Sequence, residues 1–313
     1  MRVTGNSITQ NLVSQLHLLA ARQARLQQQA ASGQRVTAPE DDPAAMGRAL
    51  DLQAEDSLNA QHALNISTLQ NRANVSASAL QALKKISDRA SEIATLASAI
   101  QSPENLEAAG IELKQLIQEA VRLANSQDGD QFVFAGTRSD QPPFTLTTDS
   151  EGTVTAVTYA GNSAQLQAQI AKNALISVDA PGANSSGTGP RGVFSDSRYG
   201  ADFFGHLISL QNHLLAGDTA AIQNVDRPGL LKDEDNIIFQ TANNSVILAR
   251  LETAAVTTED QRVSLQKTLS NVAGADLTTT LVQLAQIQNS YQLAVQSSAK
   301  LLELQQSLFS ALR

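Results

Sequence analysis

The fold of this chain is decided by residues 277–313, LTTTLVQLAQIQNSYQLAVQSSAKLLELQQSLFSALR. Along this segment apolar or uncharged residues recur in alternating steps of four and three, at positions 277, 281, 284, 288, 291, 295, 298, 302, 305, 309 and 312. That spacing is the a/d repeat of a coiled coil, in which a helix buries one stripe against another helix. The segment therefore predicts a long helix that needs a partner, because an isolated helix cannot bury its stripe.

The first segment of the chain carries a shorter version of the same repeat. Residues 6–32 read as a helix that ends at Gly33, and its stripe consists of Leu12, Leu16, Leu19, Gln23, Leu26 and Ala30. We therefore expect the two terminal helices to pair within one chain. A second apolar row in the last segment, Ile287, Ala294, Leu301 and Leu308, widens the stripe beyond what one partner covers, so we also expect contacts between copies. The expected assembly interface comprises Leu12, Leu16, Leu19, Leu26, Leu281, Leu284, Ile287, Tyr291, Val295, Leu302, Phe309 and Leu312.

Composition narrows the classes of function. The 313 residues include 0 Cys and carry a net charge of -8, which argues against disulfides, thiolate metal sites and a nucleic-acid footprint. No apolar run is long enough to span a bilayer and no cleavable signal sequence opens the chain, so any export is expected to leave the N-terminus intact. Aromatic residues are absent before Phe132, so the outer segments pack with Ala, Leu, Ile and Val.

In the middle of the chain the spacing of apolar residues changes twice, from helical to strand-like and back to helical. Asp42-Pro43 predicts a helix start, with helices running to about residue 100 and from Ser102-Pro103 to Asp128-Gly129. Strands are predicted over 131–135, 153–159 and 176–178, and a flexible surface loop over 180–192; helical spacing returns over 203–214 and 236–272. The prediction is an elongated, mainly α protein with coiled-coil terminal helices and a small β insertion. Its parts are a terminal assembly domain (1–60 and 271–313), a middle helical bundle (61–130 and 200–270) and an outward β-rich domain (131–199).

Three groups of residues are candidates for a catalytic, metal or phosphate site. Glu40, Asp41 and Asp42 could hold a metal or act as an acid–base pair, but Pro43 at the next position favours a capping turn. His206 and His213 lie seven residues apart, whereas helical metal pairs are usually four apart, so these histidines, like His17 and His62, are expected to be ordinary surface residues. The glycine-rich loop containing Arg191 lacks the flanking elements of a phosphate cradle. We therefore predict no enzyme activity, no cofactor and no metal.

Several motifs together resemble the flagellin superfamily. Residues 31–45, ASGQRVTAPEDDPAA, resemble its signature loop, here carried by Gly33, Arg35, Pro39, Asp41, Asp42 and Pro43. The prolines on both sides of the acidic pair, the FVFAGT of residues 132–137, the PPF of 142–144 and the YAGN of 159–162 are similar to its hook-associated branch. Residues 288–312 resemble the C-terminal helix that the superfamily shares.

The resemblance implies a structural protein at the junction of hook and filament in the bacterial flagellum. It implies unfolded export through the flagellar type III channel, and assembly with hook-associated protein 1, with flagellin and with copies of itself, after contact with an export chaperone. It implies neither membrane insertion nor nucleic-acid binding. Three other readings stay open: a flagellin filament subunit, a surface-binding adhesin whose β insertion binds the ligand, and an enzyme carried on a helical stalk.

Overall fold

The computed structural model describes the backbone of residues 5–99 and 102–311; within its helices, the side chains of 5–9, 302, 305, 306 and 308–311 are not described. The described chain is mainly helical. Its contacts divide it into two units, one formed by residues 1–58 and 261–313 and the other by residues 59–260. The β-rich segment belongs to the second unit, and the division into three parts stays a prediction. None of the described helices is both long enough and apolar enough to cross a membrane.

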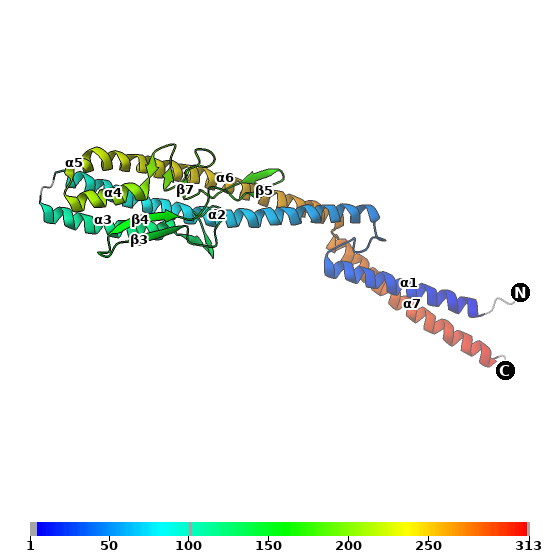
Figure 1. Cartoon of the computed structure of the whole chain (residues 1–313). Helices are drawn as coiled ribbons and strands as arrows, with labels where there is room; N and C mark the ends of the chain where they lie inside the picture. Colours follow the sequence, from blue (N-terminus) through cyan, green and yellow to red (C-terminus); the bar gives the residue numbers. More distant parts are fainter. Residues whose placement is uncertain (1–4, 100–101, 312–313) are drawn as a thin grey trace. The chain divides into compact units, whose positions relative to one another are not determined.

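The first unit is built from helices at both ends of the chain. It contains α1 (Gly5–Ser32), the start of α2 (Pro43–Ala97), the end of α6 (Arg227–Ala273) and α7 (Leu277–Ala311). Helices α1 and α7 lie side by side (Figure 1). A small core of Val36, Ala45, Ala49 and Ala273 joins the loop after α1 to α2 and α6. Arg262 on α6 and Asp56 on α2 form an ion pair at 3.3 Å within the same unit.

The second unit is a helical bundle with small sheets on its surface (Figure 1). Its helices are the rest of α2 and α6, with α3 (Pro103–Ala124), α4 (Phe203–Ala216), the single turn α5 (Thr219–Ala221) and a π-helical turn, η1 (Ile222–Asp226). Ser102 precedes Pro103 as expected, although its side chain makes no capping hydrogen bond. Asp202 caps α4, and Gly217, at φ +68°, ends it.

The strands are short and form four separate sheets. The first three are antiparallel pairs: β1 (Gln127–Asp128) with β2 (Gln131–Phe132), β3 (Phe144–Thr148) with β4 (Val154–Tyr159), and β5 (Ala168–Ala171) with β6 (Ala174–Ile176). In the fourth, β8 (Ser195–Asp196) lies between the parallel β7 (Ala183–Asn184) and the antiparallel β9 (Ala201–Asp202). The expected strands over 131–135 and 176–178 are thus only partly formed: their pairing ends at Phe132 and Ile176, and Phe134 and Val178 beyond those ends are buried.

Aromatic rings join the sheets to the helices. The Phe144 and Phe194 rings lie 4.8 Å apart, and Phe194 stacks on Phe204 of α4 at 5.2 Å. These rings share one core with the apolar faces of α2, α3 and α4. A second core holds the β5–β6 hairpin against α2 and α6 through Ile66, Ala73, Ile170, Ile176, Val178 and Leu251. The β segment is therefore packed into the bundle and is not an independent layer.

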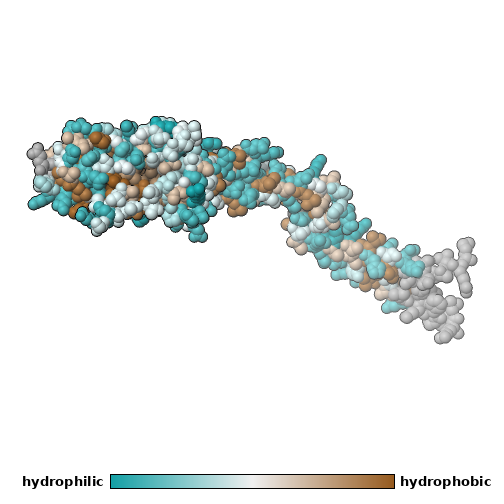
Figure 2. Space-filling model, viewed as in Figure 1, coloured by the Kyte–Doolittle hydropathy of each residue, from teal (hydrophilic) through white to brown (hydrophobic). Residues whose placement is uncertain are grey.

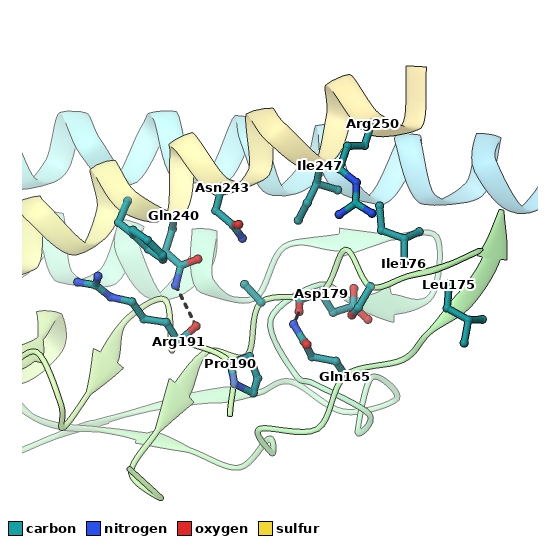
Figure 3. Close-up of a pocket in the computed structure, with 13 residues that line it drawn as sticks. Gln165, Leu175, Ile176, Asp179, Pro190, Arg191, Gln240, Asn243, Ile247 and Arg250 are labelled. Carbon is teal, nitrogen blue, oxygen red and sulfur yellow. Dashed lines mark hydrogen bonds between the residues drawn. The ribbon is translucent and has the colours of Figure 1, made fainter. Parts of the chain in front are cut away.

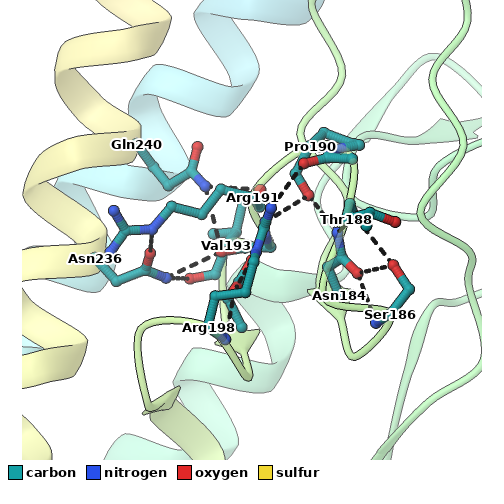
Figure 4. Close-up of polar contacts among 12 residues, drawn as sticks. Asn184, Ser186, Thr188, Pro190, Arg191, Val193, Arg198, Asn236 and Gln240 are labelled. Atoms are coloured by element: carbon teal, nitrogen blue, oxygen red, sulfur yellow. Dashed lines mark hydrogen bonds and ion pairs between the residues drawn. The ribbon is translucent and has the colours of Figure 1, made fainter.

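The loop expected over residues 180–192 is at the surface only over 185–189, and hydrogen bonds hold its flanks. The side chain of Asn184 is buried, and its amide donates to the carbonyls of Thr188 (2.7 Å) and Pro190 (2.6 Å) (Figure 4). Asn236 and Gln240 on α6 donate to the backbone of residues 191–193, which fixes the loop to the bundle (Figure 4). Glycines allow the tight path, and buried side-chain amides replace the missing regular hydrogen bonds.

Candidate assembly interface

The stripe predicted on α1 is the face that α1 turns toward α7. Leu12, Leu16, Leu19, Gln23, Leu26 and Ala30 are all half-buried, whereas the residues beside them are mostly exposed. Helix α1 packs against α7, so these positions form one side of a two-helix seam. The alternation of four and three residues keeps the stripe facing its partner, as in coiled coils. The half-burial of these positions agrees with the expected pairing of the two helices, whereas their role in assembly stays a prediction.

The phase predicted for α7 is partly wrong. The less exposed positions on α7 are Thr280, Leu284, Ile287, Tyr291, Ala294 and Ser298. Leu284 and Tyr291 were expected in the seam, but Ile287 and Ala294 were assigned to a second row for other copies. The physical reason is the width of the apolar stripe, of which one partner covers only part. Helix α1 packs on the side where Thr280, Ala294 and Ser298 are small, which allows a close approach.

Leu281 and Val295, expected in the seam, are instead exposed on α7. Leu281 is 55% exposed, and Val295 and Leu277 lie uncovered on the same flank. Leu293 on another part of the surface is 66% exposed; Val282 and Leu304, eleven residues to either side of it, are exposed as well. Eleven residues are about three turns, so these three side chains form a row. Figure 2 shows such hydrophobic residues at the surface of the α1–α7 pair.

Three residues of the expected interface cannot be placed. The side chains of Leu302 and Phe309 are not described, and Leu312 lies outside the described residues. The uncovered side chains that are described on α1 and α7 include Val13, Leu18, Leu277, Leu281, Val282, Leu293, Val295, Leu301 and Leu304. Single exposed aliphatic residues are normal on protein surfaces, whereas the exposed aliphatic residues of α7 form two rows.

The signature loop ties the end of α1 to the end of α6. Gly33 has φ +67°, a left-handed conformation that glycine adopts without strain, and its carbonyl accepts from the N–H of Ala275 at 2.9 Å. The N–H of Arg35 donates to the carbonyl of Ala273 at 2.7 Å. The Arg35 guanidinium donates to the carbonyl of Val272 at 3.0 Å. The chain therefore enters α2 and α7 from one hydrogen-bonded junction.

The acidic pair in this loop serves as a turn and a cap. Asp41 accepts from the N–H groups of Thr37 (3.0 Å) and Ala38 (3.1 Å), and Arg25 on α1 lies 2.5 Å from its other oxygen. Asp42 accepts from the N–H of Ala45 at 3.0 Å, so it caps α2. The backbone donors, Thr37 first for Asp41 and Ala45 first for Asp42, lower the pKa of both carboxyls. The expected capping role is confirmed.

Other residues of this loop are Pro39, Glu40 and Pro43. Pro39 and Glu40 are exposed, whereas Pro43 is the first residue of α2. Asp276 repeats the capping arrangement at α7, where it accepts from the N–H groups of Thr278 (3.0 Å) and Thr279 (3.2 Å). Sequence reasoning missed this cap, although an Asp one residue before the helix is a signal for it.

The expectation that the histidines are ordinary surface residues is wrong for three of them. His206 Nδ1 lies 2.7 Å from the buried carboxylate of Asp233, and His213 Nδ1 lies 2.7 Å from that of Asp226. His62 is buried in α2. The hydrogen bond with Asp233 raises the pKa of His206. No periodicity signals these pairs, because each joins α4 to a residue of another element: Asp226 ends the π-helical turn η1, and Asp233 lies on α6.

Comparisons with known proteins agree with this architecture. Residues 3–139 match the family described as the bacterial flagellin N-terminal helical region. Flagellar hook-associated protein 3 of Salmonella typhimurium is 27% identical over 146 residues, which are 46% of this chain and 46% of that protein. The chain therefore spans less than half of the curated relative that it matches.

Solved structures share the fold at low sequence identity. A putative flagellar hook-associated protein from Vibrio parahaemolyticus has a TM-score of 0.63 and 17% identity, and the match covers 75% of this chain and 100% of that one. FlgL from Bacillus cereus has a TM-score of 0.55 and 20% identity, with 70% and 99% covered. FlgL from Xanthomonas campestris gives 0.55 and 20%, with 70% and 98% covered.

The chain is thus mainly helical and similar in fold to solved flagellar hook-associated proteins, and its residues 3–139 are similar to the bacterial flagellin N-terminal helical region.

Proposed function

We propose that this chain is a structural subunit of the bacterial flagellum that joins the hook to the filament. The observation that carries the proposal is the α1–α7 pair, in which each helix covers only part of the other's apolar surface. Two uncovered rows on α7 suit neighbouring subunits, because burial of aliphatic side chains is the main favourable term in association. The matches to hook-associated protein 3 support this position in the flagellum.

The mechanism is physical. Terminal helices that have little cover in one subunit gain stability when neighbours cover the rows on α7, so their ordering is coupled to incorporation. The expected interface residues, from Leu12 to Leu312, would then divide into a seam within the subunit and rows between subunits. The signature loop would hold α1 and α7 in one register. The subunit would act without catalysis and outside the cell, after export through the flagellar channel.

The partners follow from this position. They are hook-associated protein 1 on the hook side, flagellin on the filament side, other copies of the chain around the axis, and an export chaperone before secretion. Heterologous contacts between identical subunits generate a helical array, so a short zone needs partners at both ends.

The proposal is tested by adding the purified chain to isolated hooks that carry hook-associated protein 1. Electron microscopy should show a short terminal zone, on which added flagellin then grows. Long filaments formed by the chain alone would contradict the junction role and identify a filament subunit. Failure to bind hooks at all would count against both readings.

A further inference from the structure

A pocket in the second unit lies between α6 and the segments that follow β6 and β7 (Figure 3). Its volume is about 400 Å³, within the range of sites that hold small molecules, roughly 300–1,000 Å³. One wall is the α6 face that carries Gln240, Asn243, Ile247 and Arg250. The opposite wall is formed by Leu175, Ile176, Ser177 and Asp179. The pocket thus combines aliphatic walls with a few polar groups.

One cation in this pocket is uncommitted. Within the part of the chain that the structure describes, the Arg250 guanidinium has no ion-pair or hydrogen-bond partner. Figure 3 shows that Arg250 and Asn243 both point from α6 into the pocket, toward Ile176 and Asp179. Arg191 at the other end is already engaged, because its Nε donates to Asn236 Oδ1 at 2.5 Å and its guanidinium lies 3.7 Å from the centre of the Tyr199 ring.

A second polar group in the pocket also lacks a partner. Ser177 Oγ is buried, and it has no hydrogen-bond partner among the described residues. A buried hydroxyl without a partner is unfavourable, and most such groups in folded proteins find one. Ser177 lines the same pocket as Arg250, but its Oγ is covered by neighbouring atoms and is not open to the cavity.

The buried carboxylate of Asp179 limits the negative charge that a ligand in this pocket can carry. Asp179 is 3% exposed and pairs with Arg72, which also donates to the carbonyl of Phe132 at 2.9 Å. Burial raises the pKa of Asp179, and Arg72 opposes that rise. A dianionic head would meet this buried carboxylate, whereas a single negative charge can be balanced by Arg250 alone. Guanidinium groups bind carboxylates in a bidentate fashion.

From these contacts we propose that the pocket binds a small monocarboxylate with an aliphatic body. The carboxylate lies at Arg250, with Asn243 as a further donor, and the aliphatic part lies against Leu175, Ile176 and Ile247. The site belongs to the second unit alone and goes beyond the proposed structural role, so its failure would leave that role untouched.

The test uses hexanoate as the probe and hexanamide as its uncharged counterpart, with the full-length chain. Titration followed by ¹⁵N-resolved NMR should show saturable shifts at Ser177, Asn243 and Arg250, with a Kd on the order of 1 mM for hexanoate. Hexanamide should bind about 10-fold more weakly, because it lacks the charge. Equal affinity for the two probes would overturn the assignment of Arg250 as the carboxylate partner.

Two matched variants complete the test. Arg250→Gln should raise the Kd for hexanoate about 10-fold. Arg122→Gln, a change of the same kind at a surface arginine on α3, should leave it unchanged. A Kd that is the same in Arg250→Gln and the unmodified chain would overturn the proposal, as would the absence of saturation up to about 20 mM, well above the expected Kd.

Discussion

The guanidinium of Arg35 donates to the backbone carbonyl of Val272 at 3.0 Å, across 237 residues of sequence. This contact joins the loop that follows α1 to the last turn of α6. In the same loop, the carbonyl of Gly33 accepts a hydrogen bond from the N–H of Ala275. Neighbouring hydrogen bonds therefore link the segments that follow α1 and α6. The register between α1 and α7 therefore depends on the hydrogen bonds and the small apolar core of this loop, and not only on the apolar seam.

Removing this contact should loosen the first unit. Arg35→Gln shortens the side chain and removes the charge that faces Asp42 at 3.5 Å. We expect a loss of about 1 kcal/mol in the free energy of unfolding, the typical value of one hydrogen bond to a charged group near the surface. Urea denaturation measures it, with Arg48→Gln on the exposed surface of α2 as the matched control. Equal midpoints for the two variants would show that the contact contributes nothing.

The pair of His206 and Asp233 should make the second unit sensitive to pH. Asp233 raises the pKa of His206 above 6.5, against the opposing effects of burial and of Lys232. A group whose pKa is higher in the folded than in the unfolded protein contributes its full stabilisation of the fold below the unfolded pKa. That contribution is lost as the pH rises through the folded pKa. Stability should therefore decline from about pH 6.5 upward through the folded pKa of His206.

Substitution of the histidine tests that sign. His206→Gln should remove this decline, as measured by thermal unfolding at a series of pH values. His17→Gln on the exposed side of α1 serves as the matched control and should keep the decline. A decline of the same size in His206→Gln would assign the pH dependence to other groups. Burial also raises the pKa of its partner Asp233, so this carboxyl contributes a decline of the same sign that begins at lower pH.

The close approach of α4 to α6 depends on Gly229. A Cβ at this position would lie 2.7 Å from Cδ2 of His206, closer than side chains tolerate. Gly229→Ala should therefore destabilise the second unit by about 1–3 kcal/mol, as overpacking does. Gly47→Ala on α2, where a Cβ meets nothing within 4 Å, should instead stabilise its helix by about 0.5–1 kcal/mol. Stabilisation by both changes in denaturant titrations would contradict the close contact.

The sequence was most informative where one helix faces one partner. The α1 stripe from Leu12 to Ala30 was predicted residue by residue, because its apolar positions are few. On α7 the apolar positions are too many for the pattern to choose a phase, and packing against α1 decided that Ile287 lies in the seam and Leu281 outside it.

Contacts made by polar side chains were harder to predict. Asp42 was found because a cap precedes its helix directly, with Pro43 as a local signal. Asn184 and the histidine–aspartate pairs were missed, because their partners are identified only after the chain has packed. Hydrogen bonds of this kind depend on three-dimensional distance and leave no period in the sequence.

The central claim is that uncovered aliphatic side chains on α7 join subunits together. It is tested most directly by comparing Val295→Asp with Gln296→Asp, two neighbouring exposed positions of which only the first is apolar. Electron microscopy of hooks incubated with each variant and then with flagellin gives the readout. The account predicts that Val295→Asp fails to form the terminal zone while its circular dichroism stays unchanged, and that Gln296→Asp assembles. Normal zones and filament growth with Val295→Asp would contradict it.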